Sequence, residues 1–196
     1  GQDWDTGLIA RGESYLTVEE VRLGENGTVH HIGSLVGELN IGDVVSCSVN
    51  QNRRSVNTRL HSAGHVIDMA IDSLGLDWIA QKGQHYPHLS AVEYEGDWDP
   101  ERTEELRAKI EQTANEIIAK GTDNSLIFMS VEEMQKVVKH VPDNIPKNKP
   151  ARVVMYGQDF GIPCGGTHVR NLKQIGKLQV PKLKEKKGTI RVNYSV

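Results

Sequence analysis

Residues 57–75 read NTRLHSAGHVIDMAIDSLG, and this stretch decides how the middle of the chain folds. Its apolar and small side chains recur three or four positions apart, as one face of an α-helix requires. These residues are Leu60, Ala63, Gly64, Ile67, Ala70, Ile71 and Leu74. Asn57 can cap the start of this helix and Gly75 can end it. The stretch therefore predicts a helix that buries one face.

Two histidines, His61 and His65, stand four positions apart on this predicted helix. At that spacing their side chains share one face, about 5–6 Å apart at Cβ, so both can reach one metal ion. The pair alone is a weak signal. Ser62 follows His61, whereas a zincin protease carries its glutamate general base at that position, which argues against such a protease.

A second pair, Cys164 and His168, has the same spacing within Cys-Gly-Gly-Thr-His. The glycines predict a turn rather than a helix, and a turn can also aim a thiolate and an imidazole at one point. Together with His61 and His65, the two pairs offer three nitrogens and one sulfur, a donor set that favours Zn²⁺. Spacing alone leaves an interpretation without metal open.

The chain before the helix is rich in glycine and in β-forming residues, with short runs such as Tyr15–Val21 and Val44–Val49. Asn26-Gly27 is the strongest short signal for a β-hairpin. We expect a small antiparallel sheet, or a β-barrel-like domain, over residues 1–52. An α+β domain over residues 53–196 is expected to follow.

Turn and capping signals divide the rest of the chain. Asp99-Pro100 opens a helix at about 101–120 that Gly121 closes. Ser130 and Glu133 form a capping box for a third helix. The remaining expected elements are that helix at about 131–138, a proline-rich loop over Val141–Pro150, and strands within 76–98 and at about 152–156, 174–182 and 188–195.

The composition is that of a globular chain, with 37% hydrophobic and 25% charged residues. No apolar run approaches the roughly 18 residues that a transmembrane helix needs, so we expect no membrane partner. We find no signal peptide, and two cysteines, Cys47 and Cys164, form no disulfide framework. A cytoplasmic location is expected. The start at Gly1, inside a glycine-rich run, is interpreted as a trimmed N-terminus.

The net charge of −3 hides an asymmetry, because the segment from Cys164 to Val196 carries +7 and the remainder −10. A basic end on an acidic body predicts a polyanion near that end. The alternative is a strand edge guarded by lysines. Candidate contacts to nucleic-acid phosphates are Arg53, Arg54, Lys182, Lys184, Lys186 and Lys187.

Three motifs stand out along the chain: Arg59–His65, Gln81-Lys82-Gly83 and Pro163–Val169. They resemble the editing domain of alanyl-tRNA synthetases and its freestanding relatives, the AlaX proteins. Gly1–Gly7 is similar to the end of the family's glycine-rich segment. The resemblance implies a small β-barrel-like N-terminal part and an α+β editing core. It also implies hydrolysis of Ser-tRNA(Ala), with Gly-tRNA(Ala) as a second substrate.

The resemblance further implies that His61, His65, Cys164 and His168 are zinc ligands, and it links Gln81 to the editing pocket. We see no ATP-binding motif, which favours a freestanding editor over a synthetase. After Gly83 the sequence departs from the synthetase pattern, because Gln84-His85-Tyr86-Pro87-His88 replaces small residues. His85 and His88 could line the pocket, but histidines of this kind are more common on surface loops, and a surface loop is the expectation here.

Hydrolysis of an aminoacyl ester needs an activated water and donors for the developing oxyanion. Zn²⁺ can lower the pKa of bound water to about 7 or polarise the carbonyl. Four protein ligands close the coordination sphere. Either one ligand opens, for which His168 is the candidate, or the metal orients the substrate while water is activated elsewhere. Backbone N–H groups of Gly165 and Gly166 are candidate oxyanion donors. Candidates for contacting the serine hydroxyl are Thr6, Thr28, Thr58 and Gln81.

Two alternatives stay open. In the first, Cys164 is the nucleophile and a nearby histidine activates it. In the second, the chain is no enzyme, and zinc only stabilises a tRNA-binding module or an appendage of a synthetase.

Overall fold

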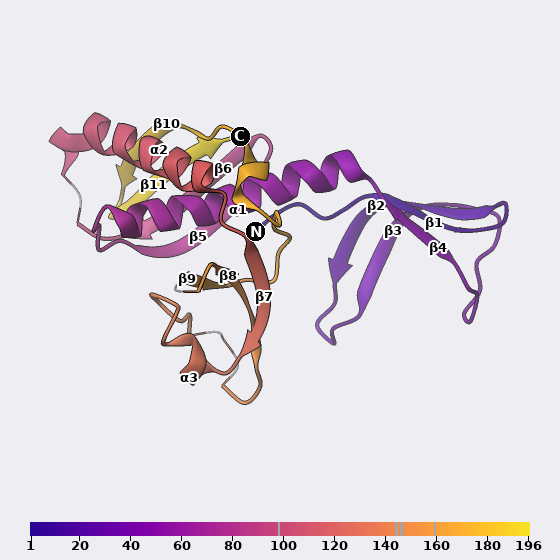
Figure 1. Ribbon diagram of the computed structural model, residues 1–196. Helices are drawn as coiled ribbons and strands as arrows, with labels where there is room; N and C mark the ends of the chain where they lie inside the picture. Colours follow the sequence, from indigo (N-terminus) through magenta and orange to yellow (C-terminus); the bar gives the residue numbers. More distant parts are fainter. Residues whose placement is uncertain (98, 144, 146, 159) are drawn as a thin grey trace. The chain divides into compact units, whose positions relative to one another are not determined.

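The computed structural model describes residues 1–97, 99–143, 145, 147–158 and 160–196 (Figure 1). The chain forms two compact units, one of Asp3–Asn57 and one of Gly1–Gln2 with Thr58–Val196. Both contain mostly antiparallel sheets, and helices complete a mixed α/β architecture. Among the described residues, no helix has the length and apolar character that crossing a membrane requires.

The Asp3–Asn57 unit is built on a four-stranded sheet in the order β3-β2-β1-β4. Its strands are β1 (Gly7–Arg11), β2 (Ser14–Leu23), β3 (Val29–Val36) and β4 (Ser46–Val49). All neighbouring strands are antiparallel, and the described pairings leave β3 and β4 as open edges. The expected barrel-like closure is therefore wrong. A closed sheet needs tilted, staggered strands all round, and β4 has four residues where β3 has eight.

The turn between β2 and β3 lies at the predicted Asn-Gly pair. Gly27 has φ 82°, a left-handed conformation that suits glycine. The Asn26 side chain accepts a hydrogen bond from the Thr28 backbone N–H at 3.0 Å. The hairpin prediction is confirmed.

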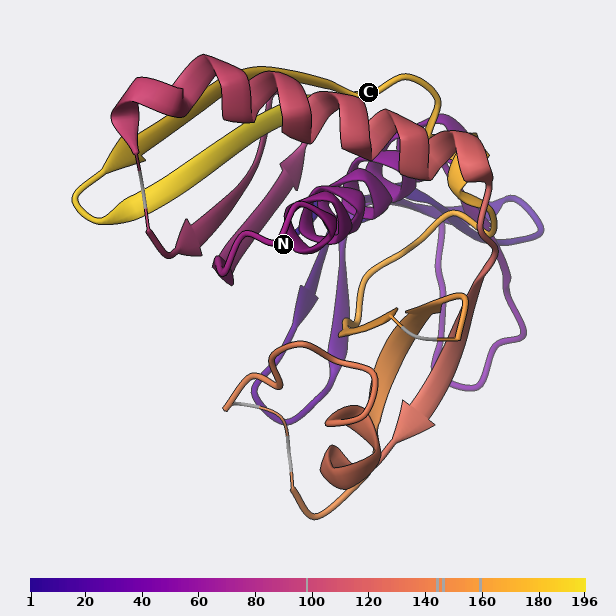
Figure 2. The same cartoon turned by 60° about the vertical axis from the view of Figure 1, so that its left-hand side comes forward.

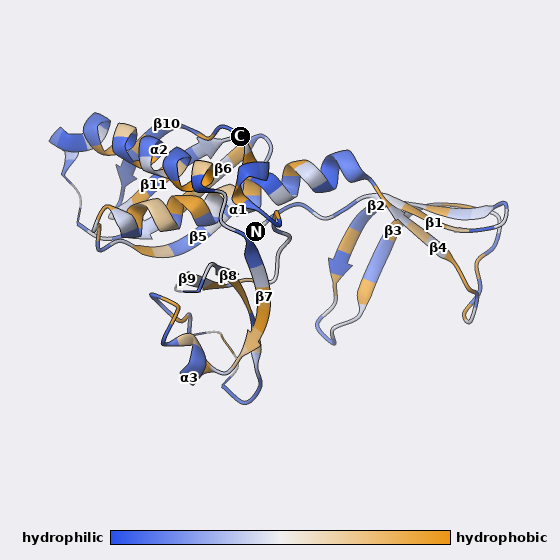
Figure 3. Cartoon of the chain, in the orientation of Figure 1, coloured by the Kyte–Doolittle hydropathy of each residue, from blue (hydrophilic) through white to orange (hydrophobic). Residues whose placement is uncertain are grey.

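Helix α1 (Gln51–Ser73) begins six residues before the cap that we predicted. The Asn50 side chain accepts a hydrogen bond from the Arg53 N–H at 3.1 Å, as a helix N-cap does. Asn57 is instead buried within the helix, where its amide donates to the Asp3 carbonyl. The predicted end is right, since Gly75 follows with φ +67°. The first turns of α1 are hydrophilic, whereas the later ones contain most of its hydrophobic residues (Figure 3).

The predicted domain boundary after residue 52 lies just inside this helix. The compact units divide at Asn57 and Thr58, so α1 contributes residues to both. Its later turns, from Leu60 onward, belong to the larger unit, and they carry the candidate metal ligands His61 and His65.

The larger unit contains a second antiparallel sheet in the order β10-β11-β6-β5. Its strands are β5 (Ile79–Tyr86), β6 (Leu89–Glu95), β10 (Gln179–Lys186) and β11 (Thr189–Ser195). Helix α2 (Thr103–Lys120) follows a short 3₁₀ helix, η1 (Pro100–Arg102), and ends at Gly121 with φ 70°. The predicted helix at 101–120 is thereby confirmed. Figure 2 shows α1 and α2 lying beside this sheet.

A single hydrophobic cluster joins these elements. Ile67 and Ile71 of α1, Ile110 of α2, Tyr94 of β6 and Ile190 of β11 are all at most 1% exposed. Fully buried apolar side chains from two helices and two strands hold the unit together, because burial of this kind is the main favourable contribution to folding.

A three-stranded sheet, β7-β8-β9, completes the larger unit. It consists of β7 (Asn124–Met129), β8 (Ala151–Tyr156) and β9 (Phe160–Pro163). Successive side chains of β8 point to opposite faces. Val154 and Tyr156 therefore join the main cluster, whereas Val153 and Met155 pack in a smaller one with Met134.

Several predicted elements need correction. We did not predict β7, whose central residues are exposed, or β9, which carries Gly161 and Pro163. The Ser130 capping box is present, but α3 (Val131–Met134) is shorter than predicted. The strand expected at 174–182 begins at Gln179, because Leu172–Ile175 forms the 3₁₀ helix η2. The predicted ranges 76–98 and 141–150 include residues 98, 144 and 146, which lie outside the described residues.

Ile110→Ala is expected to destabilise the protein by about 2–5 kcal/mol, because it opens a cavity at a 0% exposed position of the main cluster. Urea unfolding measures the loss. Gln112→Ala, on the exposed side of the same helix, is the control and is expected to change stability by less than about 0.5 kcal/mol. Equal effects of the two substitutions would contradict the assignment of the core.

Candidate metal centre

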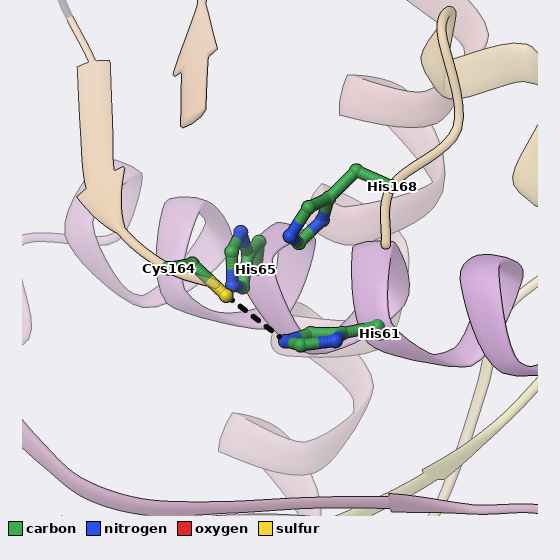
Figure 4. Close-up of side chains that lie close together, drawn as sticks. All are labelled: His61, His65, Cys164 and His168. Atoms are coloured by element: carbon green, nitrogen blue, oxygen red, sulfur yellow. Dashed lines mark hydrogen bonds between the residues drawn. The ribbon is translucent and has the colours of Figure 1, made fainter. Parts of the chain in front are cut away.

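Four side chains from two distant stretches meet in the larger unit (Figure 4). His61 and His65 project from neighbouring turns of α1. Cys164 follows the last residue of β9, and His168 precedes η2. One donor atom of each residue lies within 4.8 Å of those of the other three. The arrangement gives three imidazoles and one thiol directed at a common point.

The rings are close without being hydrogen-bonded to one another. The centroid of His168 lies 4.6 Å from that of His61 and 4.5 Å from that of His65. Cys164 Sγ lies 3.2 Å from His61 Nε2. His61 and His65 are buried, and the other two are half-buried. Water therefore has little access to the space that the four donors face.

Each imidazole engages a protein partner through Nδ1. His61 Nδ1 lies 2.5 Å from Gln2 Oε1, an acceptor, so this nitrogen carries the hydrogen and the Nε2 lone pair faces Cys164. Tyr156 Oη lies 2.9 Å from His65 Nδ1 and 3.5 Å from His168 Nδ1. Partners on the outer nitrogen fix the tautomer and orientation of metal-binding histidines in the same way.

One buried polar atom at the centre has no partner: His168 Nε2. A buried polar atom without a partner is rare and calls for an explanation. A cation held between the four donors supplies one, and three imidazoles with a thiolate are a typical donor set for Zn²⁺. The residues therefore fit a zinc ion.

Burial controls the protonation of the centre. It lowers the pKa of His61 to about 4 and that of His168 to about 3, with smaller contributions from neighbouring positive charges. It also lowers the pKa of His65 well below its usual value. The imidazoles are neutral at pH 7, so their lone pairs are available to a metal. Burial raises the pKa of the Cys164 thiol, so the surrounding protein alone does not form a thiolate.

Gly166 allows the two stretches to approach. A Cβ at this position would lie 2.0 Å from His61 Cε1, so only glycine fits. Its N–H donates to Cys164 Sγ at 3.4 Å, a different use from the oxyanion contact that we expected. A Cβ at Gly165 would meet no other atom within 4 Å, and this residue stays a candidate oxyanion donor.

The turn that carries Cys164 and His168 is held by contacts of the chain itself. Arg152 donates to the Gly166 carbonyl at 2.8 Å, and the Val169 N–H donates to the Ser62 hydroxyl at 3.0 Å. The second contact joins the turn to α1 between His61 and His65. A turn anchored at both ends loses little freedom on binding a metal, which favours tight binding.

The other predicted site residues do not join the four. Gln81 is exposed at an irregularity of β5, and its amide lies 3.4 Å from a Glu95 carboxylate oxygen. Thr58 lies in the same unit as the centre, with its hydroxyl 3.0 Å from that of Thr167. Thr6, Thr28, Arg53 and Arg54 belong to the Asp3–Asn57 unit, where the two arginines form ion pairs with Asp3 and Asp5. Lys182, Lys184 and Lys186 alternate along β10, and Lys187 follows in the turn.

Two residues around the centre, Gln2 and Tyr156, were missed by the sequence analysis, and a third, His85, was considered for the pocket but ranked lower there. His85 was expected on a surface loop, but it lies on β5 and is 5% exposed. Gln2 and Tyr156 reach the centre through contacts between distant parts of the sequence, which spacing does not reveal.

A cavity of about 360 Å³ lies in the larger unit, and none of the four donor residues lines it. Ile71, Trp78 and Phe160 contribute apolar walls, and Pro163, the residue before Cys164, lines one side. Asp68, a half-buried residue one turn beyond His65 on α1, places a carboxyl in the cavity wall. The Tyr94 hydroxyl donates to Asp68, and burial raises the pKa of this carboxyl to about 7.

Asp68→Asn tests this raised pKa. A carboxyl with a higher pKa in the folded protein stabilises the fold at low pH and loses that contribution as pH rises toward the folded value. Stability is therefore expected to fall between about pH 4 and 7 in the wild type. Over this pH range, the free energy of unfolding of the variant should fall by at least about 1 kcal/mol less than that of the wild type. One pKa unit corresponds to about 1.4 kcal/mol. Urea unfolding at pH 4, 5.5 and 8 measures it.

Asp72→Asn is the matched control, because Asp72 also lines the cavity but is exposed and paired with Lys139. The other titratable groups around the cavity are Asp77, His140 and Tyr94. They are present in both variants, so their contributions cancel in the comparison. Identical pH profiles for the Asp68 variant and the wild type would contradict the assignment.

Comparisons with known proteins show which family this chain resembles. Residues 151–193, which include Cys164 and His168, match the family model described as the threonyl and alanyl tRNA synthetase second additional domain. The alanyl-tRNA editing protein AlaX-M of Saccharolobus solfataricus is 33% identical over 204 residues, covering 100% of this chain and 83% of that protein. An alanine–tRNA ligase of Staphylococcus aureus is 31% identical over 182 residues, covering 92% of this chain. The chain spans only 20% of that ligase.

Proposed function

The chain belongs to the family of alanyl-tRNA editing proteins, and on this premise we propose that it hydrolyses the ester between a wrongly attached serine and alanine tRNA. Glycine attached to the same tRNA is the proposed second substrate. The observation that carries the proposal is the convergence of three neutral imidazoles and a thiol around the unpartnered His168 Nε2. Editing takes place where translation does, so the proposed location is the cytoplasm.

We propose that His61, His65, Cys164 and His168 hold Zn²⁺. A bound zinc ion would supply Lewis acidity to the ester carbonyl or lower the pKa of a bound water. Of the three histidines, His168 has the longest contact to its outer partner, 3.5 Å to Tyr156, and it is only half-buried. This weaker anchoring supports His168 as the proposed ligand that would leave a coordination position open for the ester.

The turn beside Cys164 is proposed to receive the developing oxyanion. The Gly166 N–H is occupied by the cysteine sulfur, which leaves Gly165 as the stronger candidate. A preformed backbone donor stabilises an oxyanion without reorganising during the reaction.

Selection of serine over alanine requires a partner for the serine hydroxyl. Of the four residues that we considered, Thr58 has the best support, because it lies in the same unit as the centre and its hydroxyl contacts Thr167, the neighbour of His168. A site that hydrogen-bonds a substrate hydroxyl rejects the analogue that lacks it far more strongly than an apolar pocket rejects one methylene. Gln81 has weaker support because it is exposed.

A cysteine nucleophile has less support than a metal. The Cys164 thiol has a raised pKa, and the nearest imidazole, His61, has a pKa of about 4. Neither partner is tuned to produce a thiolate at neutral pH.

Deacylation of Ser-tRNA(Ala), Gly-tRNA(Ala) and Ala-tRNA(Ala) tests the proposal. The zinc-loaded wild type is expected to release serine, and glycine as well, while sparing alanine. Cys164→Ala should lose at least about 100-fold in rate, since even the outer partners of metal ligands matter by 10–100-fold. Cys47→Ala is the control. Cys47 is the other free cysteine and is exposed, so this variant should keep full activity.

A chelator should abolish the activity and added zinc should restore it. If the zinc-loaded protein binds tRNA but cleaves none of the three esters, the chain is a zinc-stabilised binding module instead. Activity that survives the chelator would favour Cys164 as the nucleophile.

The basic strand β10 is the proposed tRNA contact in the larger unit. Lys182, Lys184 and Lys186 share one face of this edge strand. Replacing all three with alanine should weaken tRNA binding and reduce the slope of log K against log salt by about 0.7–0.9 for each lost phosphate contact. Filter binding at several salt concentrations measures the slope.

The matched control replaces three exposed lysines outside β10, namely Lys109, Lys120 and Lys136. An equal loss of binding in this control would show that general charge, rather than the β10 face, attracts the tRNA.

A further inference from the structure

His85 lies against the metal centre without belonging to it. Its ring stacks on that of His61, with centroids 4.3 Å apart and planes at 20°. The residue is 5% exposed. His61 therefore presents one face to another imidazole, while its edge points toward Cys164.

A chain of hydrogen bonds fixes the orientation of the His85 ring. The Tyr194 hydroxyl donates its only proton to the Leu60 carbonyl at 3.0 Å. Its oxygen is then an acceptor for His85 Nδ1, which carries the ring hydrogen. Leu60 precedes His61 on α1, so this chain ties the His85 ring to the backbone beside His61.

Two glycines make room for the ring. A Cβ at Gly64 would lie 2.4 Å from His85 Cε1, and one at Gly83 would lie 2.6 Å from His85 Nε2. Glycine is unfavourable in the interior of a helix and of a strand. Its presence at both positions is explained by the imidazole that occupies the space between them.

We propose that His85 is a positioning residue that clamps the His61 imidazole from its face. The Gln2 side chain holds the Nδ1 edge of the same ring. Face and edge contacts together leave the ring one orientation, with Nε2 toward Cys164. The inference rests on the proposed metal-binding function, and it assigns a role to a residue outside the ligand set.

The clamp acts on the metal-free protein, because every contact in it is made by the chain itself. Without the His85 ring, His61 can turn about its side-chain bonds, and the four donors no longer converge before a metal arrives. Metal binding would then have to order the ring as well. The expected consequence is weaker binding, by the 10–100-fold typical of residues that orient metal ligands.

Competition with a chromophoric chelator measures zinc affinity in the purified protein. His85→Ala is expected to bind zinc 10–100-fold more weakly than the wild type. His88→Ala, at an exposed histidine three residues along, is the matched control and should bind zinc normally. Circular dichroism and urea unfolding establish that each variant is folded.

Tyr194→Phe is the second variant, and it guards against misfolding of His85→Ala. It keeps the buried ring of Tyr194 and removes only the hydroxyl that orients His85. It should weaken zinc binding in the same direction, by a smaller factor. Substitution of Co²⁺ for zinc adds a spectroscopic readout, because its visible spectrum changes with the arrangement of the ligands.

A shifted Co²⁺ spectrum in a folded His85→Ala protein supports a positioning role, which lost packing alone would not produce. Unchanged zinc affinity and an unchanged Co²⁺ spectrum in that protein would overturn it. The proposed function fails separately: a wild type that binds zinc tightly but cleaves no aminoacyl ester ends the deacylase proposal and leaves the clamp standing. A wild type that binds no zinc overturns the clamp.

Discussion

The way in which the rest of the larger unit surrounds the candidate centre depends on the burial of two imidazoles in the middle turns of α1. His61 and His65 alternate with Ala63, Val66 and other residues that are 0% exposed, so the helix cannot turn its histidines outward without exposing its core face. Desolvation keeps both rings neutral. Neutral rings need hydrogen-bond partners or a cation, and the surrounding chain provides the partners on their outer nitrogens.

The parts of the fold that were predictable from the sequence are those governed by local rules. Helical spacing predicted the later part of α1, and the signals at Asn26-Gly27, Ser130 and Gly121 gave a hairpin, a helix start and a helix end. The start of α1 was missed because Asn50 and Asn57 are equally good caps by type. The open sheet and the exposed strand β7 depend on pairings between distant segments, which local patterns do not contain.

The candidate site also has one part that was predictable from the sequence and one part that was not. The four proposed ligands were named from two short motifs, and the structure brings their donor atoms together; their binding of zinc stays a prediction. The residues that orient them come from elsewhere: Gln2 from the start of the chain, Tyr156 from β8 and His85 from β5. No spacing rule connects these positions, because each meets the ligands only after the sheets have formed.

Three glycines connect the local sequence patterns with the contacts between distant segments. Gly64, Gly83 and Gly166 each stand where a Cβ would strike an imidazole ring, at distances of 2.4, 2.6 and 2.0 Å respectively. By residue type alone, glycine weakens a helix at Gly64 and a strand at Gly83, and it favours a turn at Gly166. In the structure they are the openings that let His61 and His85 lie face to face and let the cysteine turn approach His61. The arrangement of the centre thus depends on the missing side chains of these three glycines as much as on the imidazoles and the thiol.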